Sequence, residues 1–201
     1  MKTAATVQML NLKLPTDPRW VNLAEMDLEE ILTDHAYCEQ KATTSCISLI
    51  IGYPDYPEII AAVAPIVTEE WGHFRMVLHE LEKRGLKLGY PRKDEYVNGL
   101  MKVMKKGSGR VQALLEKLLL CALIEARSCE RFRLLSLYCA DEDLRNFYHK
   151  FMVAEAGHYV LFIELARKYF DREMVDKRWA EFLAFEEELL ANIEVRGDRM
   201  H

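Results

Sequence analysis

Apolar residues recur at helical spacing along nearly the whole chain, and this pattern constrains the fold more than any other feature. The first clear example is the series Leu28, Ile31, Leu32, Cys38, Ala42, Cys46 and Leu49. This spacing places the side chains on one face of a helix. A half-buried strand would need strict alternation of apolar and polar residues, and no stretch alternates convincingly in that way. The sequence therefore predicts an all-α protein.

Capping residues and turn residues divide the pattern into five long helices. Asp27 and Glu30 form a capping box, and Gly85 is placed to end the second helix. Pro65 lies inside that second helix and must break or kink it, because proline lacks the amide hydrogen and clashes with the preceding turn. The expected helices cover about residues 27–52, 57–84, 111–139, 141–165 and 171–195, with Asp141 or Asp143 and then Asp171 as caps of the last two.

Two helical hairpins joined by a long crossover and followed by an extra helix are typical of a ferritin-like four-helix bundle. We expect a single domain over residues 1–201, with an N-terminal extension at 1–26 and a basic crossover at 85–110. The last residues, 196–201, are expected to form a flexible tail.

Composition excludes several classes of protein. The net charge is −5, so the chain as a whole shows no preference for nucleic acid. Five cysteines without C-x-x-C spacing indicate reduced thiols in a reducing compartment. No apolar run is long enough for a membrane span, because charges interrupt even "LLEKLLLCALIEA", and the N-terminus lacks the apolar block of a signal peptide. We therefore expect a cytoplasmic protein that does not enter a membrane.

Two Glu-x-x-His motifs stand out against this background. Glu70 precedes His73 by three residues, and Glu155 precedes His158 by three. Residues three apart on a helix share a face, so an oxygen and a nitrogen ligand can reach the same ion. Chance alone would produce two such pairs roughly one time in ten, since 22 of the 201 residues are glutamate. The motifs therefore need support from their surroundings.

A further glutamate precedes each motif by a similar interval. Glu39 lies 31 residues before Glu70, and Glu125 lies 30 residues before Glu155. Both fall on the apolar stripe of their own helices, where an uncompensated carboxylate is costly. The chain thus contains a twofold repeat of Glu followed by Glu-x-x-His. This repeat predicts that the six residues form one dinuclear metal site.

Charge balance indicates what such a site would hold. Four carboxylates in one core would repel each other, whereas two divalent cations would neutralise them, with neutral imidazoles completing the ligand shell. Oxygen and imidazole ligands suit iron or manganese, and no cysteine is placed to favour zinc or copper. Helical spacing does not distinguish iron from manganese.

Several residues compete with this assignment. Glu69 lies four residues before His73 and could replace Glu70, and Glu130 lies nearly opposite Glu125 on an ideal helix. We prefer Glu125 because it continues the apolar stripe. His35 lies one turn before Glu39, where an ordinary core or solvated role competes with support of a metal ligand. The remaining histidines receive no metal role: His79, His149 and His201.

The segments "HAYCEQKA", "EEWGHFRMVLHELEKRG", "LIEARSCERF" and "AEAGHYVLF" together resemble the MiaE family of tRNA 2-methylthio-N6-isopentenyladenosine hydroxylases. The resemblance covers about residues 10–195. It implies a ferritin-like non-haem di-iron monooxygenase that hydroxylates the isopentenyl group of the modified adenosine next to the anticodon. It also implies two iron ions, O₂ as co-substrate and an external electron donor or reductase. The implied ligands, which would act in catalysis through the metals, are Glu39, Glu70, His73, Glu125, Glu155 and His158.

Charge distribution offers an independent test of tRNA as partner. Residues 81–110 contain nine basic and three acidic side chains, a net charge of +6, so the rest of the chain carries −5 − 6 = −11. A localised basic segment on an acidic protein is typical of a nucleic-acid footprint, although a solvated lysine-rich crossover would have the same charge. Tyr90 and Tyr96 could stack on unpaired bases. The candidate tRNA-binding residues are Arg92, Lys93, Lys102, Lys105, Lys106 and Arg110.

Other functions remain open from the ligand pattern alone. A ferritin-like chain could be a manganese catalase, a quinone hydroxylase or a non-enzymatic iron-binding bundle. A catalase has no need of a polyanion site, and a quinone hydroxylase should present an apolar helix to a membrane. The basic crossover therefore favours the tRNA hydroxylase.

Overall fold

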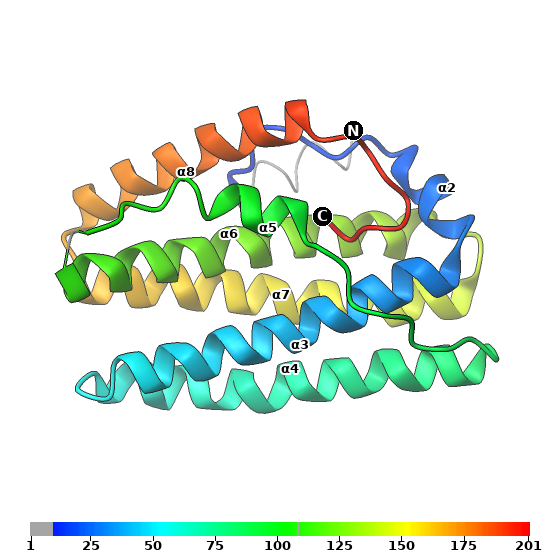
Figure 1. The fold of residues 1–201 in the computed structure, drawn as a ribbon, viewed down its shortest axis with the longest axis horizontal. Helices are drawn as coiled ribbons and strands as arrows, with labels where there is room; N and C mark the ends of the chain where they lie inside the picture. The colour runs from blue at the N-terminus through cyan, green and yellow to red at the C-terminus, as the bar shows by residue number, and fades with distance from the viewer. Residues whose placement is uncertain (1–9, 108) are drawn as a thin grey trace. The chain divides into compact units, whose positions relative to one another are not determined.

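The protein is all-helical in the computed structural model, which describes residues 10–107 and 109–201 (Figure 1). This confirms the predicted fold class, and no strand occurs among those residues. The helices are α2 (Trp20–Glu25), α3 (Leu28–Gly52), α4 (Pro57–Lys83), α5 (Glu95–Leu100), α6 (Gly109–Tyr138), α7 (Glu142–Tyr169) and α8 (Arg172–Asn192). They belong to two compact units, which are described separately below.

The first unit, here the α3–α4 unit, comprises Asn22–Lys93 and Arg196–Met200. Helices α3 and α4 form a hairpin and lie side by side (Figure 1). Asp27 caps α3 as predicted, since its side chain accepts a hydrogen bond from the backbone N–H of Glu30 at 3.1 Å. Gly85 follows α4 with a φ of +68°, a left-handed conformation that glycine adopts without strain.

Proline does not interrupt this hairpin. We predicted that Pro65 would break or kink α4, and the helix is not broken, since it runs from Pro57 to Lys83. The neighbouring residues Val63 and Ile66 are buried in the core. Burial of this apolar face offsets the hydrogen bond that Pro65 cannot donate.

The second unit, here the α6–α8 unit, comprises Asp94–Val195, His201 and the described residues of Met1–Val21. Helix α6 packs along α7, and α8 contacts both of them (Figure 1). Asp141 caps α7 and Asp171 caps α8 through their side chains. The short helix α5 lies within the crossover and packs closely on α8, because a Cβ atom at Gly99 would lie only 2.6 Å from Cδ1 of Leu189.

A buried arginine connects three segments of the α6–α8 unit. Arg127 of α6 donates hydrogen bonds to both carboxylate oxygens of Glu186 in α8, at 2.8 and 3.0 Å, and to Glu130 at 3.1 Å. It also donates to the backbone oxygen of Leu14 at 2.9 Å, which attaches the N-terminal segment. Tyr96 of α5 donates its hydroxyl to Glu186 at 2.9 Å. Burial raises the pKa of Tyr96 well above its usual value, so this hydroxyl remains a donor.

The C-terminal residues are packed, in contrast to the flexible tail that we expected. Met200 is buried, and its backbone N–H donates to Asp34 at 2.7 Å. Arg92 binds Asp198 at 2.9 Å, an ion pair between residues 106 positions apart that the local sequence does not reveal.

Two further expectations concern compartment and membrane. All five cysteines are free thiols, as expected, and burial raises the pKa of Cys121 and Cys129 to about 12. Among the described residues, none of the helices combines the length and the apolar character that crossing a bilayer requires.

Replacement of Arg127 by methionine tests the buried network. Arg127→Met would leave Glu130 and Glu186 buried without their counter-ion, so the free energy of unfolding should fall by about 3–5 kcal/mol in denaturant titrations followed by circular dichroism. The control is Arg167→Met, which removes a more exposed ion pair with Asp176 at 2.6 Å. That pair should contribute about 0–1 kcal/mol. Equal losses in the two variants would contradict a special role for Arg127.

Candidate metal centre

The α3–α4 unit brings together the first predicted set of ligands. Glu39 comes from α3, and Glu70 and His73 come from neighbouring turns of α4. Each offers a ligand atom that lies within 4.8 Å of the others. Nδ1 of His73 lies 3.4 Å from Oε2 of Glu39 and 3.6 Å from Oε2 of Glu70. All three side chains are buried, so two carboxylates and an imidazole face each other away from solvent.

The structure also separates Glu70 from its sequence neighbour. Glu70 is buried in the set, whereas Glu69 is exposed on α4. The helix repeat explains this difference, because consecutive residues point about 100° apart around the axis. Glu70, and not Glu69, therefore joins the buried donors around His73.

His35 supports this set from within α3. Its ring is fully buried, and Nε2 lies 2.7 Å from Oε1 of Glu39, one turn away. The solvated role that we considered for His35 is thus wrong. Contact through one carboxylate oxygen fixes the rotamer of Glu39 and leaves its other oxygen directed toward His73. Such contacts orient metal ligands in proteins that bind metals.

The α6–α8 unit contains the second predicted set. Glu125 comes from α6, and Glu155 and His158 come from α7. Their ligand atoms also lie within 4.8 Å of one another, and Nδ1 of His158 is 3.5 Å from Oε2 of Glu155. All three side chains are buried. The two units therefore carry equivalent sets of two glutamates and one histidine, as the sequence repeat predicts.

Glu130 is buried as well, but in a different environment. Its carboxylate accepts hydrogen bonds from Arg127, from the backbone N–H of Thr16 at 3.1 Å and from the Thr16 hydroxyl at 2.6 Å. Helix α6 is buried on more than one face, which explains how Glu125 and Glu130 are both shielded from solvent while pointing apart. The choice of Glu125 over Glu130 agrees with this geometry.

The other buried glutamates show why the two sets suit metal ions. Glu80, Glu116 and Glu186 each pair with an arginine, at distances of 2.6–2.8 Å. In the two sets, by contrast, imidazoles lie beside the carboxylates, and a metal-bound imidazole is neutral. Oxygen and nitrogen donors of this kind bind iron or manganese. Among the described residues, no cysteine joins the glutamates and histidines of either set. Each set by itself therefore offers the oxygen and nitrogen donors of a metal site.

The predicted tRNA-binding residues fall in both units. Arg92 is engaged in ion pairs with Glu30 and Asp198 of the α3–α4 unit, so its charge is largely compensated. Lys93 is exposed in the same unit, and four exposed cations lie in the α6–α8 unit: Lys102, Lys105, Lys106 and Arg110.

The two tyrosines considered for base stacking differ. Tyr90 is 91% exposed, but Tyr96 is only 1% exposed. Tyr96 instead packs against the ring of His201, with ring centroids 4.9 Å apart, and donates its hydroxyl to Glu186. Stacking of an RNA base on Tyr96 was therefore a wrong prediction, because helix α5 turns this residue into the core.

Sequence reasoning missed two features around the basic residues. A pocket lies beside Lys106 and Arg110, and a buried ion pair between Arg178 and Glu116 holds the loop before α6. Arg178 lies 62 residues from Glu116, and local spacing carries no signal for such a pairing.

Comparison with known proteins identifies a family that the chain matches over nearly its whole length. Residues 3–201 match the family described as "tRNA-(MS[2]IO[6]A)-hydroxylase (MiaE)". A protein of Pseudomonas putida named tRNA 2-(methylsulfanyl)-N(6)-isopentenyladenosine(37) hydroxylase is 36% identical over 160 residues, which are 80% of this chain and 77% of that protein. A protein of the same name from Salmonella typhimurium is 27% identical over an alignment of 206 positions, which covers 78% of this chain and 75% of that protein.

A solved structure resembles the fold. "Protein 43 with aldehyde deformylating oxygenase activity from Synechococcus" superposes with a TM-score of 0.88 at 33% identity, and the match covers 94% of both chains. This ferritin-like neighbour confirms the architecture predicted from the helix pattern and indicates an oxygenase scaffold. With the family match over nearly the entire sequence, the chain belongs to the MiaE family of tRNA hydroxylases.

Proposed function

We propose that this chain hydroxylates the isopentenyl group of 2-methylthio-N6-isopentenyladenosine next to the anticodon of tRNA. The observation that carries this proposal is the family match over residues 3–201, together with the Pseudomonas putida relative named for that reaction. The two buried sets of glutamate and histidine provide the donors that an oxygenase of this fold requires. We place the activity in the cytoplasm, which suits an enzyme with five free thiols.

We further propose that Glu39, Glu70, His73, Glu125, Glu155 and His158 hold two iron ions in one dinuclear centre. The twofold repeat supports a shared centre, because the second set follows the first by 85 or 86 residues and has the same composition. Two divalent ions would balance the four carboxylates. Bound iron would provide the redox chemistry needed to react with O₂, for which protein side chains are unsuited.

The chain's own residues have two roles in this scheme. His35 holds Glu39 in one orientation by its 2.7 Å contact, and burial of the donors keeps water away from the site. Conversion of a C–H bond to C–OH by O₂ places one oxygen atom in the product and the other in water. The balance requires two electrons and two protons from outside, so a reductase or another electron donor is a necessary partner.

The exposed lysines of the crossover are the proposed contacts to the tRNA backbone. Lys102, Lys106 and Arg110 carry this proposal, with Lys93 and Lys105 as further candidates. Phosphate contacts by lysine and arginine position nucleic acids and make affinity depend on salt. Arg92 contributes less, because Glu30 and Asp198 already occupy its guanidinium group.

A second candidate function comes from the solved structure. The Synechococcus protein, 33% identical to this chain, has aldehyde deformylating oxygenase activity. An enzyme of that class would remove the formyl carbon from an aldehyde and would not need a binding surface for a polyanion. The basic crossover favours tRNA over an aldehyde, and supplying the purified protein with either substrate distinguishes the two activities.

Nucleoside analysis tests the reaction. Cells that lack this protein should accumulate 2-methylthio-N6-isopentenyladenosine in tRNA and lose the hydroxylated nucleoside, as measured by liquid chromatography and mass spectrometry. Expression of the unaltered protein should restore the hydroxylated form, and expression of Glu155→Ala should not. The substrate assignment fails if the hydroxylated nucleoside is unchanged in the absence of the protein.

Adjacent glutamates provide a matched test of the metal centre. Glu70→Ala removes a buried donor, whereas Glu69→Ala removes an exposed carboxylate from the same helix turn. After anaerobic loading with Fe²⁺ and desalting, Glu70→Ala should bind iron at least about tenfold more weakly than the unaltered protein, and Glu69→Ala should bind normally. Elemental analysis measures the bound iron. Equal iron in both variants would remove Glu70 from the ligand set.

Charge reversal tests the tRNA contacts. Lys102→Glu/Lys106→Glu should weaken tRNA binding and lower the slope of log affinity against log salt by roughly 1.5, because each lost phosphate contact contributes about 0.7–0.9. The control Lys150→Glu/Lys168→Glu makes the same change in net charge on exposed positions of α7. Fluorescence anisotropy over a range of salt concentrations measures the tRNA affinity and its salt dependence for each double variant. If the two double variants behave alike, the tRNA footprint lies elsewhere.

A further inference from the structure

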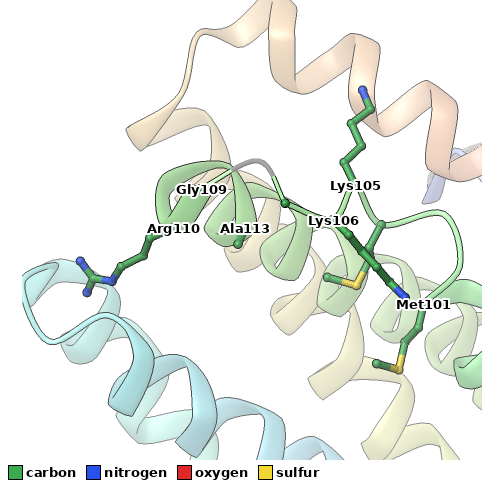
Figure 2. Close-up of a pocket in the computed structure, with 8 residues that line it drawn as sticks. Met101, Lys105, Lys106, Gly109, Arg110 and Ala113 are labelled. Carbon is green, nitrogen blue, oxygen red and sulfur yellow. The ribbon is translucent and has the colours of Figure 1, made fainter.

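The loop after α5 and the first turn of α6 form a pocket of about 510 Å³ in the α6–α8 unit (Figure 2). Two glycines line it together with Met101, Met104, Lys105, Lys106, Arg110 and Ala113. Its volume falls within the range of pockets that bind small organic groups, roughly 300–1,000 Å³. None of the six candidate metal ligands belongs to it.

The charged side chains that line this pocket are all basic. Residues 101–113 contain four basic side chains and no acidic one. Lys102 and Lys106 are exposed and pair with no carboxylate in the part of the chain that the structure describes, whereas Lys105 pairs with Glu181 at 3.4 Å. Figure 2 shows Lys105 and Arg110 extending in different directions from the pocket. An anionic ligand would therefore find the most available positive charge at Lys106, with Arg110 also on the pocket lining.

A buried ion pair fixes the backbone on which these residues lie. Arg178 of α8 donates to both oxygens of Glu116, at 2.8 and 2.6 Å, and to the backbone oxygen of Val103 at 2.6 Å. Glu116 in turn accepts from the backbone N–H of Lys105 at 3.0 Å. The loop is thus held in place before any ligand arrives, which lowers the entropy lost on binding.

The pocket also has a surface suited to an aromatic ring. Met101 is 50% exposed, and Met104 lies beside it on the same loop. Methionine packs adaptably, and its polarizable sulfur makes favourable contacts with aromatic rings. Gly107 and Gly109 have positive φ angles of 76° and 82°, and a Cβ atom at either position would meet nothing within 4 Å. The side of the pocket formed by the two glycines therefore has free space next to the backbone.

We propose that this pocket binds one unpaired nucleotide of the RNA substrate, with its base against Met101 and Met104 and the adjoining phosphates beside Lys106 and Arg110. This inference rests on tRNA being the substrate, and it adds a site that reads an unpaired base away from the metal ligands. Sequence-tolerant recognition of unpaired bases combines a positively charged track with a surface on which bases pack.

A neighbouring pocket of about 460 Å³ shows why the first is preferred. Its lining includes Lys177, Met174 and Arg178, but also Glu181. The charge of Arg178 is already committed to Glu116 and Glu181. Although burial alone would raise it, hydrogen bonds from Arg178 lower the pKa of Glu116, which remains ionised and keeps this pair intact. The second pocket therefore offers a phosphate less uncompensated positive charge.

A double-mutant cycle with RNA tests the proposal. The ligands are a short RNA hairpin with an anticodon-type loop, the same hairpin with an abasic site at each loop position in turn, and an RNA duplex with the same number of phosphates. The protein variants are Met101→Ala/Met104→Ala and, as control, Met26→Ala/Met76→Ala, which truncates two exposed methionines of the α3–α4 unit. Affinity is measured at one fixed salt concentration.

Met101→Ala/Met104→Ala should weaken binding of the intact hairpin roughly three- to tenfold and leave duplex binding unchanged. One abasic position should cost the unaltered protein a similar factor and cost this variant nothing further, which shows that the base and the methionines interact. Equal effects on hairpin and duplex, or full additivity at every loop position, would overturn the proposal. RNA binding requires neither iron nor turnover, so the two proposals can fail separately. If the double-mutant cycle shows coupling between the base and the methionines but the protein does not hydroxylate tRNA, only the proposed function is rejected. If the protein hydroxylates tRNA but the cycle shows no coupling, only the nucleotide pocket is rejected.

Discussion

Burial of negative charge is the constraint on which the candidate centre depends. Each unit encloses two glutamates beside a histidine, at Glu39, Glu70 and His73 in one and at Glu125, Glu155 and His158 in the other. A carboxylate taken out of water loses several kcal/mol of hydration unless a counter-charge lies next to it. Elsewhere arginine supplies that charge, as Arg127 does for Glu186. The imidazoles of the two sets would be neutral as metal ligands and would not supply a counter-charge, whereas divalent metal ions would supply it.

Local rules predicted most of the helices and the composition of both donor sets. Asp27, Asp141 and Asp171 cap their helices as expected, because a cap depends only on the next few residues. The helix repeat likewise accounts for the burial of Glu70 and the exposure of Glu69. Pro65 does not break α4, because the burial of Val63 and Ile66, which a local rule ignores, holds the helix together.

The features that sequence could not supply depend on partners far away in the chain. Arg127 and Glu186 are 59 residues apart, and Arg92 and Asp198 are 106 apart. Such pairs form only when helices pack, so neither the ordered tail nor the neutralised charge of Arg92 follows from local pattern. Tyr96 shows the same limit, since its sequence neighbours are basic while its hydroxyl reaches Glu186 in another helix.

The scaffold does not determine the substrate. The Synechococcus protein shares the fold at a TM-score of 0.88 and has aldehyde deformylating oxygenase activity, whereas the Pseudomonas putida relative is named for a tRNA nucleoside. Function resides in sites placed on a fold, so the difference must lie in residues that deliver the substrate. In this chain, the Arg178–Glu116 pair holds a loop that carries the exposed side chains of Lys102, Lys106 and Met101. An aldehyde carries no charge that this loop would bind, whereas an RNA has both phosphates and unpaired bases that would contact it.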